Sequence, residues 1–344
     1  MKRLAFDART IGDHYPGIGS YAFGVWQALA DRVTYSIIDP TLRNTRFTIG
    51  GLTRESFGVR SPLAQIDLPL KLGDADIYYS PYFLMSYFVP CASVVTLYDA
   101  TPLYPLPAPS PIHKTNGGGM GWGSKLIFRF ANYLAGRVAR RVIVLSESAK
   151  EEMAALGVPR GKMIVCPPGL DPKFHPRTRD EVDRLKSKYS LPDKFLLCFG
   201  SKKWHKNTKA LLEIRDSRLV IIGDAPNGIR NTHYVPHIEE SDLPAFYSSA
   251  SALIFPSLRE GFGLPIIEAM ACGTPVVCLP APGVKEAAGS AAVMADDMTN
   301  AALAQAASRL HDPIFREEKR IAGLEWVKQF TWEKTVQMIL EAGG

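Results

Sequence analysis

Two carboxylates stand eight positions apart around a glycine-containing turn, in the sequence EGFGLPIIE from Glu260 to Glu268. The apolar run ASALIF before this turn predicts a buried strand, and Pro265 favours the first turn of a helix directly after it. Backbone N–H groups at the start of such a helix attract phosphate. An ionised carboxylate is only an acceptor, so each glutamate could take hydroxyl hydrogens from a sugar or a ribose. The stretch therefore predicts a site for a phosphorylated sugar or nucleotide.

Three lysines follow another predicted strand, residues 195–200, in the sequence SKKWHKN. Lys202, Lys203 and Lys206 could supply positive charge to a diphosphate. Singly, a lysine after a strand is often only solvated, and a glutamate near a helix start often only interacts with the helix dipole. Together, the lysines and glutamates indicate a binding site more strongly, because they follow strands of the same half of the chain and α/β proteins bind ligands at the ends of their strands.

A glycine pair in the first half, Gly17 and Gly19, lies between a short predicted strand at 3–8 and a predicted helix. The pair imitates a dinucleotide-binding fingerprint, which would indicate a Rossmann oxidoreductase. That fingerprint needs a turn directly after the strand, whereas about eight residues separate Arg9 from Gly17. A looser glycine loop that brings the backbone close to a phosphate or an acceptor is the better interpretation.

Strands and helices alternate along both halves of the chain, whose 344 residues exceed what one hydrophobic core usually organises. We predict two α/β domains with parallel sheets, at residues 1–172 and from residue 194 onward, joined by a charged, proline-containing linker at 173–193. The pattern predicts irregular structure over residues 40–75. The ligand site is expected at the C-terminal ends of the strands.

Positive charge is concentrated in residues 112–162, which hold nine Lys or Arg and three Glu and so carry the whole net charge of +6. A solvated helix face is one interpretation; an anionic partner such as an acidic membrane surface is the other. A glycine-rich loop at 114–124 contains Trp122, a candidate membrane or acceptor contact. The helix predicted next, at 125–141, should bury an apolar stripe and present its basic residues to solvent or to lipid. This stripe consists of Leu126, Ile127, Phe130, Leu134 and Val138.

Bulk composition is that of a globular protein, with 46% hydrophobic and 22% charged residues. No apolar run is long enough to cross a bilayer, and the first residues lack the apolar region of a signal peptide. None of the five cysteines forms a CxxC pair, which favours reduced thiols over disulfides or zinc ligands. We expect a cytoplasmic protein. Peripheral attachment to the inner face of the membrane is a further hypothesis.

In the order of these motifs the chain resembles the retaining glycosyltransferases of family four. EGFGLPIIE resembles the family signature of two glutamates separated by seven residues, and FGSKKWHKN resembles its phosphate-binding loop. Further segments with family character are FDAR, GIGSY, VVTLYDATPL, VIVLSESAKEEM, GVPRGKMIVCPPGLD and FTWEKT, so the resemblance covers nearly the whole chain. It implies the GT-B fold, in which two Rossmann-like domains face each other across a cleft. The C-terminal domain would then be 194–325, and a helix at 326–344 would complete the first domain.

The resemblance assigns most of the donor site to the second domain. Glu268 would bind the ribose, Glu260 the hydroxyls of the donor sugar, and Lys206, with Lys202 or Lys203, the diphosphate. Further donor contacts are expected at Gly261, Phe262, Gly263 and Leu264 for sugar and phosphate, at His237 and Ile238 for the base, and at Gly17 and Gly19 from the first domain. The residues predicted to take part in catalysis are Glu260, Lys206, Tyr98 and Asp99.

Three positions depart from the family pattern. Tyr98 replaces the histidine of a His-Asp pair that touches the donor sugar, which leaves the identity of that sugar open. His205 replaces a common arginine, so Lys202 or Lys203 must share the diphosphate with Lys206. Only sixteen residues lie between Lys206 and Gly223, so the helix after the phosphate loop must be truncated.

The resemblance implies a retaining, metal-independent hexosyltransferase without a cofactor, whose substrate is a nucleotide sugar. GDP-mannose is the first expectation for the donor, and a UDP-hexose is the second. The expected acceptor is a glycan or lipid-linked glycan of polysaccharide or lipopolysaccharide synthesis; a soluble acceptor, such as a sugar phosphate, is the alternative. No nucleic acid partner is expected. A glycoside hydrolase would also use two carboxylates, but Glu260 and Glu268 flank a helix start, which ranks hydrolysis and the Rossmann oxidoreductase low.

Overall fold

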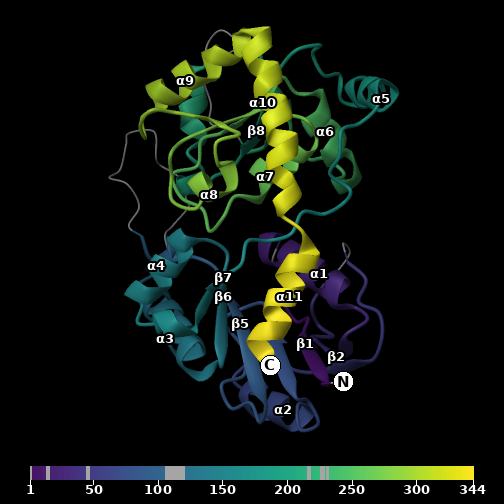
Figure 1. Ribbon diagram of the computed structural model, residues 1–344, viewed down its shortest axis with the longest axis vertical. Coiled ribbons are helices and arrows are strands. Elements are labelled where there is room, and N and C mark those ends of the chain that lie inside the picture. Colours follow the sequence, from purple (N-terminus) through teal and green to yellow (C-terminus); the bar gives the residue numbers. More distant parts are fainter. Residues whose placement is uncertain are drawn as a thin grey trace. The chain divides into compact units, whose positions relative to one another are not determined.

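The computed structural model describes residues 2–12, 16–43, 47–104, 121–214, 218–224, 229 and 232–344. These residues form two α/β units, each built around its own parallel sheet (Figure 1). Of these residues, the first unit comprises those between 2 and 103, 121–169 and 330–344, and the second comprises residue 104 and those between 170 and 329. The chain passes from the first to the second unit at Gly169, beside the predicted boundary at residue 172.

The first unit is built on a sheet of seven strands in the order β3-β2-β1-β4-β5-β6-β7, and each neighbouring pair is parallel. Its strands are β1 (Leu4–Asp7), β2 (Val33–Ile38), β3 (Thr53–Glu55), β4 (Ile77–Ser80), β5 (Ala92–Leu97), β6 (Arg141–Val144) and β7 (Met163–Val165). Every residue of β1 and of β4 is buried, as expected for the central strands of a parallel sheet covered on both faces. In register, Ala5 lies opposite Tyr78, and Val95 lies opposite Val142.

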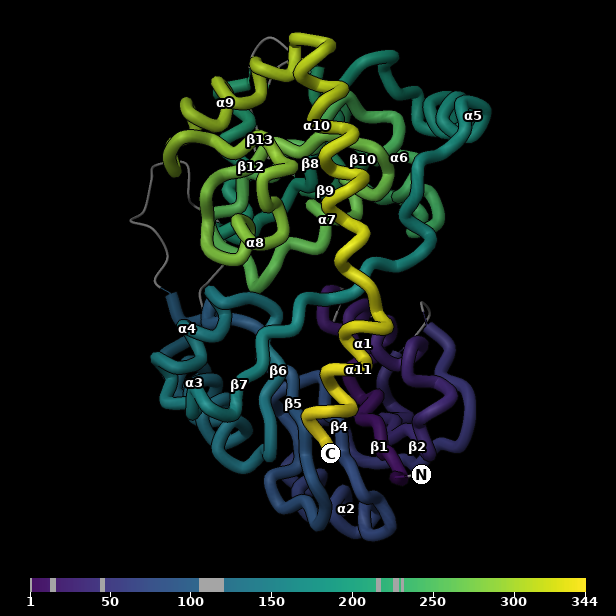
Figure 2. Tube along the Cα trace, viewed as in Figure 1, coloured from purple at the N-terminus to yellow at the C-terminus, as the bar shows by residue number. Residues whose placement is uncertain are grey.

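Helices of the first unit are α1 (Pro16–Leu29), α2 (Ala64–Lys71), α3 (Trp122–Val138), α4 (Glu147–Ala155) and α11 (Trp332–Gly343), with 3₁₀ turns η1 (Thr101–Leu103) and η2 (Arg160–Lys162). The last helix, α11, packs against α1, beside which it lies in Figure 2. A Cβ atom on Gly24 would stand 2.2 Å from the Trp332 ring, and one on Gly169 would stand 2.4 Å from Trp332. Glycine at these two positions therefore permits the C-terminal helix to dock on the first unit.

The second unit repeats the same strand order with six strands, β10-β9-β8-β11-β12-β13, again parallel. Its strands are β8 (Leu196–Gly200), β9 (Leu219–Gly223), β10 (Thr232–Val235), β11 (Ala252–Phe255), β12 (Val276–Cys278) and β13 (Val293–Met294). Its helices are α5 (Arg179–Tyr189), α6 (Leu243–Ser249), α7 (Leu264–Ala271), α8 (Val284–Ala288), α9 (Asn300–Ser308) and α10 (Pro313–Trp326), with 3₁₀ turns η3 (Trp204–Lys206), η4 (Thr208–Glu213), η5 (Glu240–Asp242), η6 (Arg309–His311) and η7 (Val327–Gln329). The truncated helix expected after the phosphate loop is the 3₁₀ turn η4.

Four of the five residues in the apolar stripe that was predicted to pack against the core face solvent instead, and the fifth, Leu134, is half-buried. Leu126, Ile127, Phe130 and Val138 are 54%, 66%, 60% and 37% exposed. The buried side carries Phe128, Ala131, Asn132, Ala135 and Gly136. A Cβ on Gly136 would stand 2.6 Å from the Val158 side chain, so small residues let this face approach its neighbours closely. Trp122 opens this helix and is not in a loop; residues 114–120 of the predicted loop lie outside the described residues.

Several short elements were not predicted. Residues 40–75, expected to be irregular, contain β3 and α2, and α2 holds Pro69 within its eight residues. The helix α10, of 14 residues, was also not predicted. The edge strands β10 and β13 escaped prediction because two to four residues are too few to display a period. No helix that the structure describes has the length and apolar character needed to cross a membrane.

Candidate functional site

Each sheet reverses its strand order at one place, between β1 and β4 in the first unit and between β8 and β11 in the second. Open parallel sheets bind ligands outside the C-terminal ends of the strands at such a switch point. In the second unit, the loop 201–207 follows β8 and the turn 256–263 follows β11. The two segments are joined because the N–H of Leu258 donates to the carbonyl of His205 at 2.7 Å. The lysine and glutamate motifs therefore meet at this edge.

Lys206 and Glu260 form an ion pair at the centre of this edge. Lys206 Nζ donates to Glu260 Oε1 at 2.7 Å, although 54 residues separate the two positions. Their side chains are 30% and 14% exposed, so the pair is partly buried and still accessible. The ammonium group has three donors, and a bond to Glu260 leaves capacity for an anionic ligand.

The turn that carries Glu260 depends on two glycines. Gly263 has φ +107° and precedes α7, in which Leu264 and Pro265 are the first two residues. Its neighbour Gly283 has φ +75°, and a Cβ there would stand 2.0 Å from the carbonyl oxygen of Glu260. The sequence motifs did not identify Gly283; a signal for it is the dipeptide Pro-Gly just before α8. At the start of α7, Pro265 has no N–H and the N–H of Ile266 donates to the carbonyl of Gly263 at 3.0 Å, so a backbone N–H offered to a ligand beside Glu260 must come from a residue before Pro265.

A second glycine pair, at the ends of β8 and β9, lets these two strand ends lie close together at the same edge of the sheet. A Cβ on Gly200, the last residue of β8, would stand 1.9 Å from the carbonyl oxygen of Asp224. Gly223, the last residue of β9, has φ +94° and approaches the carbonyl of Gly200. Because these strands end in glycine, their exits lie close together and the loop with the lysines starts directly at the switch point.

Glu268 lies in the second turn of α7 and is partly buried. Tyr247, from α6, donates its hydroxyl to Glu268 Oε2 at 2.9 Å. Burial raises the pKa of Glu268 to about 7, against the opposing effects of the Tyr247 hydrogen bond and the charge of Lys173; Asp171 and Glu240 raise it further. The carboxylate therefore titrates near neutral pH, where ionisation changes its capacity to accept hydroxyl hydrogens.

The other predicted groups of the second unit are less enclosed. Lys202 is 76% exposed and its Nζ lies 3.3 Å from Asp224 Oδ1, whereas Lys203 is exposed on the same loop. His237 is exposed and Ile238 is half-buried; both follow β10. Phe262 is buried beneath the turn. The structure thus brings Lys206 and Glu260 into contact, and the roles assigned to these two and to the other residues stay predictions.

In the first unit, Gly17 and Gly19 do not form a loop. Both lie in the first turn of α1, which begins at Pro16, a residue whose ring favours this position. A Cβ on Gly19 would stand 3.2 Å from the carbonyl oxygen of Gly12 and 3.3 Å from that of Thr10. Gly19 therefore lets the helix start lie against the segment after β1, whereas Gly17 is exposed with open space around it.

Tyr98 and Asp99 are held by backbone contacts after β5. The Tyr98 hydroxyl donates to the carbonyl of Pro81 at 2.9 Å, and Asp99 Oδ1 accepts from the N–H of Thr101 at 2.8 Å. Burial raises the pKa of Tyr98 well above its ordinary value, so the phenol stays protonated. Both side chains stabilise the strand exit, and their predicted part in catalysis remains a prediction.

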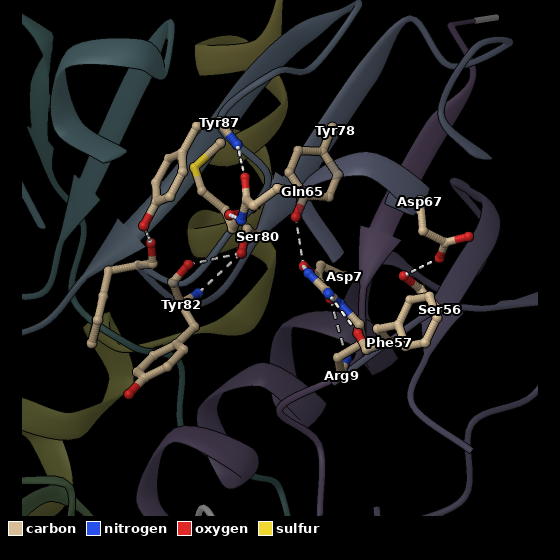
Figure 3. Close-up of polar contacts among 12 residues, drawn as sticks. Asp7, Arg9, Ser56, Phe57, Gln65, Asp67, Tyr78, Ser80, Tyr82 and Tyr87 are labelled. Carbon is tan, nitrogen blue, oxygen red and sulfur yellow. Dashed lines mark hydrogen bonds and ion pairs between the residues drawn. The ribbon is translucent and has the colours of Figure 1, made fainter. Parts of the chain in front are cut away.

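The switch point of the first unit contains a buried charged cluster that was not predicted (Figure 3). Arg9 Nε and Nη2 donate to the two carboxylate oxygens of Asp7 at 2.8 and 2.7 Å, and Nη1 donates to the carbonyl of Phe57 at 2.9 Å. Tyr78, from β4, donates to Asp7 Oδ2 at 2.5 Å. Burial opposes the charge of Arg9, but the neighbouring Asp7 raises its pKa above the usual value. The sequence FDAR, in which charged residues follow an apolar strand, is the feature that could have indicated this cluster.

All five cysteines are free thiols, as predicted, and four of them are buried. Within the described part of the chain, no group of three or more His, Cys, Asp or Glu side chains is placed to hold a metal ion.

Residues 194–312 match the model of the family described as glycosyl transferases group 1. The O-antigen chain mannosyltransferase B of Escherichia coli is 29% identical over 232 residues, which cover 59% of this chain and 60% of that protein. A D-inositol 3-phosphate glycosyltransferase of Acidothermus cellulolyticus is 34% identical over 143 residues, or 36% of this chain and 32% of that protein. The chain thus matches no more than about 60% of the length of these relatives.

Among solved structures, Anabaena Alr3699/HepE in complex with UDP-glucose aligns over 99% of both chains with a TM-score of 0.73 and 18% identity. WaaG, a glycosyltransferase involved in lipopolysaccharide biosynthesis, aligns over 99% of this chain and all of its own, with a TM-score of 0.68 and 14% identity. At these identities the likeness concerns the fold, which is the GT-B architecture predicted from the sequence.

Proposed function

We propose that the protein is a retaining, metal-independent hexosyltransferase acting on a nucleoside-diphosphate hexose, in line with the match of residues 194–312 to the model of the glycosyl transferases group 1 family. The observation that supports this most directly is the Lys206–Glu260 pair, 2.7 Å apart beside the N-terminus of α7. A cation and backbone N–H groups suit a diphosphate, while the adjacent carboxylate suits sugar hydroxyls. No cofactor enters the proposal.

The proposed chemistry follows from where charge develops. The bond between the anomeric carbon and the diphosphate oxygen breaks, and negative charge grows on the leaving group. Lys206 and the backbone of the turn that precedes Pro265 stabilise that charge. An acceptor hydroxyl attacks from the same face of the sugar, and its proton passes to the departing phosphate, so the configuration is retained without a protein nucleophile. Glu260 orients the sugar through its hydroxyls and turns Lys206 toward the phosphate.

For the donor, we propose GDP-mannose first and a UDP-hexose second. The first choice is supported by the O-antigen chain mannosyltransferase B among the relatives. The second is supported by Alr3699/HepE, whose structure contains UDP-glucose. The acceptor is proposed to be a glycan or lipid-linked glycan of a surface polysaccharide, in line with the same mannosyltransferase and with WaaG.

A donor screen tests this proposal. Purified protein is incubated with GDP-mannose, UDP-glucose and related donors, and release of GDP or UDP is measured with and without glycan acceptors. We expect release from one nucleotide class and its loss in Glu260→Ala. Full activity of Glu260→Ala would contradict the site assignment. Thermal stabilisation by NAD, with none by GDP or UDP, would instead indicate the Rossmann oxidoreductase.

We further propose that the protein works at an anionic membrane surface through α3. Trp122, Ile127 and Phe130 are 83%, 66% and 60% exposed, and this helix contains three cationic and no acidic residues. Arg129 and Arg137 are exposed on it, as are Arg140 and Arg141 just beyond its end. Exposed aromatic and aliphatic side chains flanked by cations are typical of helices that lie in a lipid interface. The part of the basic segment at 112–120 lies outside the described residues.

Sedimentation with vesicles of anionic lipid tests the membrane proposal. We expect binding to fall in Trp122→Ser/Phe130→Ser and, at low salt, after neutralisation of Arg137, Arg140 and Arg141. Equal binding in both variants would contradict the proposal. Zwitterionic vesicles are the matched control, because they offer the same apolar interior without the anionic surface.

A further inference from the structure

A strap of residues at the start of the second unit, 170–177, lies beside the carboxylate of Glu268. Within it, Phe174 is buried, and its ring makes an edge contact with the ring of Tyr247 at 6.0 Å between centroids. Tyr247 is the residue whose hydroxyl donates to Glu268. The strap is therefore packed against the side chain that orients the predicted ribose carboxylate.

Lys173 ties this strap to the segment that follows β10. Its Nζ lies 2.9 Å from Glu240 Oε1 and 3.3 Å from Asp171 Oδ2. The backbone on both sides is fixed, because the N–H of Lys173 donates to Asp171 Oδ1 at 2.9 Å and its carbonyl accepts from Arg177 Nη2 at 2.9 Å. Glu240 comes two residues after Ile238, which with His237 is predicted to contact the base.

The charged groups around Glu268 come from three elements. The strap brings Lys173 and Asp171, η5 brings Glu240, and α6 brings the hydroxyl of Tyr247. The thiol of Cys272, at the end of α7, also faces Glu268; burial raises the pKa of this thiol to about 12, so it stays neutral. The charge of Lys173 thus lowers the pKa of Glu268, whereas the charges of Asp171 and Glu240 raise it.

We propose that Lys173 is a positioning residue for the nucleotide of the donor, which fixes the segment carrying His237 and Ile238 through Glu240 and supplies positive charge beside Glu268. The inference rests on the proposed function, because it takes Glu268 as the acceptor of the ribose hydroxyls. An ionised Glu268 can accept both hydroxyls, whereas a protonated one has lost part of this capacity. Nucleotide affinity should therefore rise with pH through the titration of Glu268, and Lys173 should set where this rise occurs.

Titration calorimetry with UDP and with GDP between pH 6 and pH 9 tests the inference. In Lys173→Met, the midpoint of the affinity rise should move up by about one pH unit, because Asp171 and Glu240 then face Glu268 without their cation. That shift alone makes binding about fivefold weaker at pH 7 and has almost no effect at pH 9, while loss of the contact with Glu240 weakens binding to the same extent at every pH. Lys173→Arg keeps the charge and should restore the wild-type midpoint.

Two further variants separate charge from anchoring. Glu240→Gln removes a negative charge, so its midpoint should move down; this variant also keeps the test valid should Lys173→Met fail to fold. Lys188→Met is the matched control, since Lys188 Nζ contacts Asp242 Oδ2 at 2.8 Å and Glu239 Oε2 at 3.1 Å on the same segment, from α5. It should weaken binding at every pH without moving the midpoint.

The outcomes are distinct from those of the function test. A wild-type protein that binds neither UDP nor GDP would contradict the proposed function. A wild-type protein that binds one of them with an unchanged midpoint in Lys173→Met, or a midpoint that moves upward in Glu240→Gln, would overturn the role of Lys173 alone.

Discussion

The two units share one strand order and differ in what occupies the switch point of the sheet. In the first unit, Asp7 and Arg9 are 2% and 1% exposed, and Tyr78 completes the cluster. In the second unit, Glu260 and Lys206 remain 14% and 30% exposed beside the N-terminus of α7. Both places hold one carboxylate and one cation at the end of a central strand.

The difference shows that burial determines whether an ion pair maintains the structure or remains available to a ligand. Arg9 donates hydrogen bonds to Asp7 and to the carbonyl of Phe57, so its bonding capacity is used within the protein. These bonds link β1 to the segment after β3. Lys206 keeps donor capacity and reaches solvent, so a ligand can share it. A desolvated pair is expected to maintain structure, whereas a partly exposed pair is available for binding.

The largest expected effect concerns the buried pair. Arg9→Met should lower the free energy of unfolding by about 3 to 5 kcal/mol, because Asp7 is left buried without its cation. Urea denaturation followed by circular dichroism measures this loss. The double variant Asp7→Asn/Arg9→Met, which removes both charges, should recover part of it. If the single variant lost less than about 1 kcal/mol of unfolding free energy, the Asp7–Arg9 pair would not be important for the stability of the fold.

The exposed pair should respond in activity and hardly in stability. Lys206→Met should reduce hexosyl transfer by about 10² to 10³-fold, since a positive charge that stabilises the leaving diphosphate is lost. Steady-state release of the nucleotide measures this effect, and a thermal melt checks the fold. Lys194→Met, at an exposed lysine before β8, is the control. Similar rates for both lysine variants would refute the assignment.

A smaller effect is expected from Gly283, the glycine behind the turn that carries Glu260. In Gly283→Ala the new methyl group would meet the carbonyl of Glu260, 2.0 Å away, at a φ of +75° that alanine disfavours. The turn must shift, and we expect about tenfold slower transfer, because displaced catalytic groups lose rate steeply. Gly161→Ala, with open space around its Cβ, should leave the rate as it is. A wild-type rate for Gly283→Ala would mean that the turn adapts.

The smallest effect should come from the hydrogen bond to Glu268. Tyr247→Phe removes a donor that holds the pKa of Glu268 down, so this pKa rises above its value of about 7. Nucleotide affinity at pH 7 should fall about fivefold, the equivalent of one ordinary hydrogen bond, and recover at higher pH. Calorimetry at pH 7 and pH 9 checks the sign: equal losses at both values would exclude an effect through ionisation.

Sequence reasoning located the second unit better than the first. The strands β8, β11 and β12 are continuous apolar runs, and α7 is bounded by Gly263, Pro265 and Gly273, so local signals specify them. In the first unit, β3 and α2 are short, α2 contains a proline, and both were missed. For α3 the period was visible, but two faces could have been buried; the small residues around Gly136 decided which one packs, and no local pattern encodes that choice.

The sequence by itself determined the alternation of strands and helices, the two-unit α/β architecture, and the residue types gathered after β8 and β11. It did so because apolar runs, glycines and prolines act on their immediate neighbours. Only the tertiary structure decided that Lys206 meets Glu260 across 54 positions, that Tyr78 meets Asp7 across 71, and that Lys173 lies among the carboxylates near Glu268. Such contacts depend on the order in which strands pair and on how deeply each pair is buried, and both are properties of the assembled sheet.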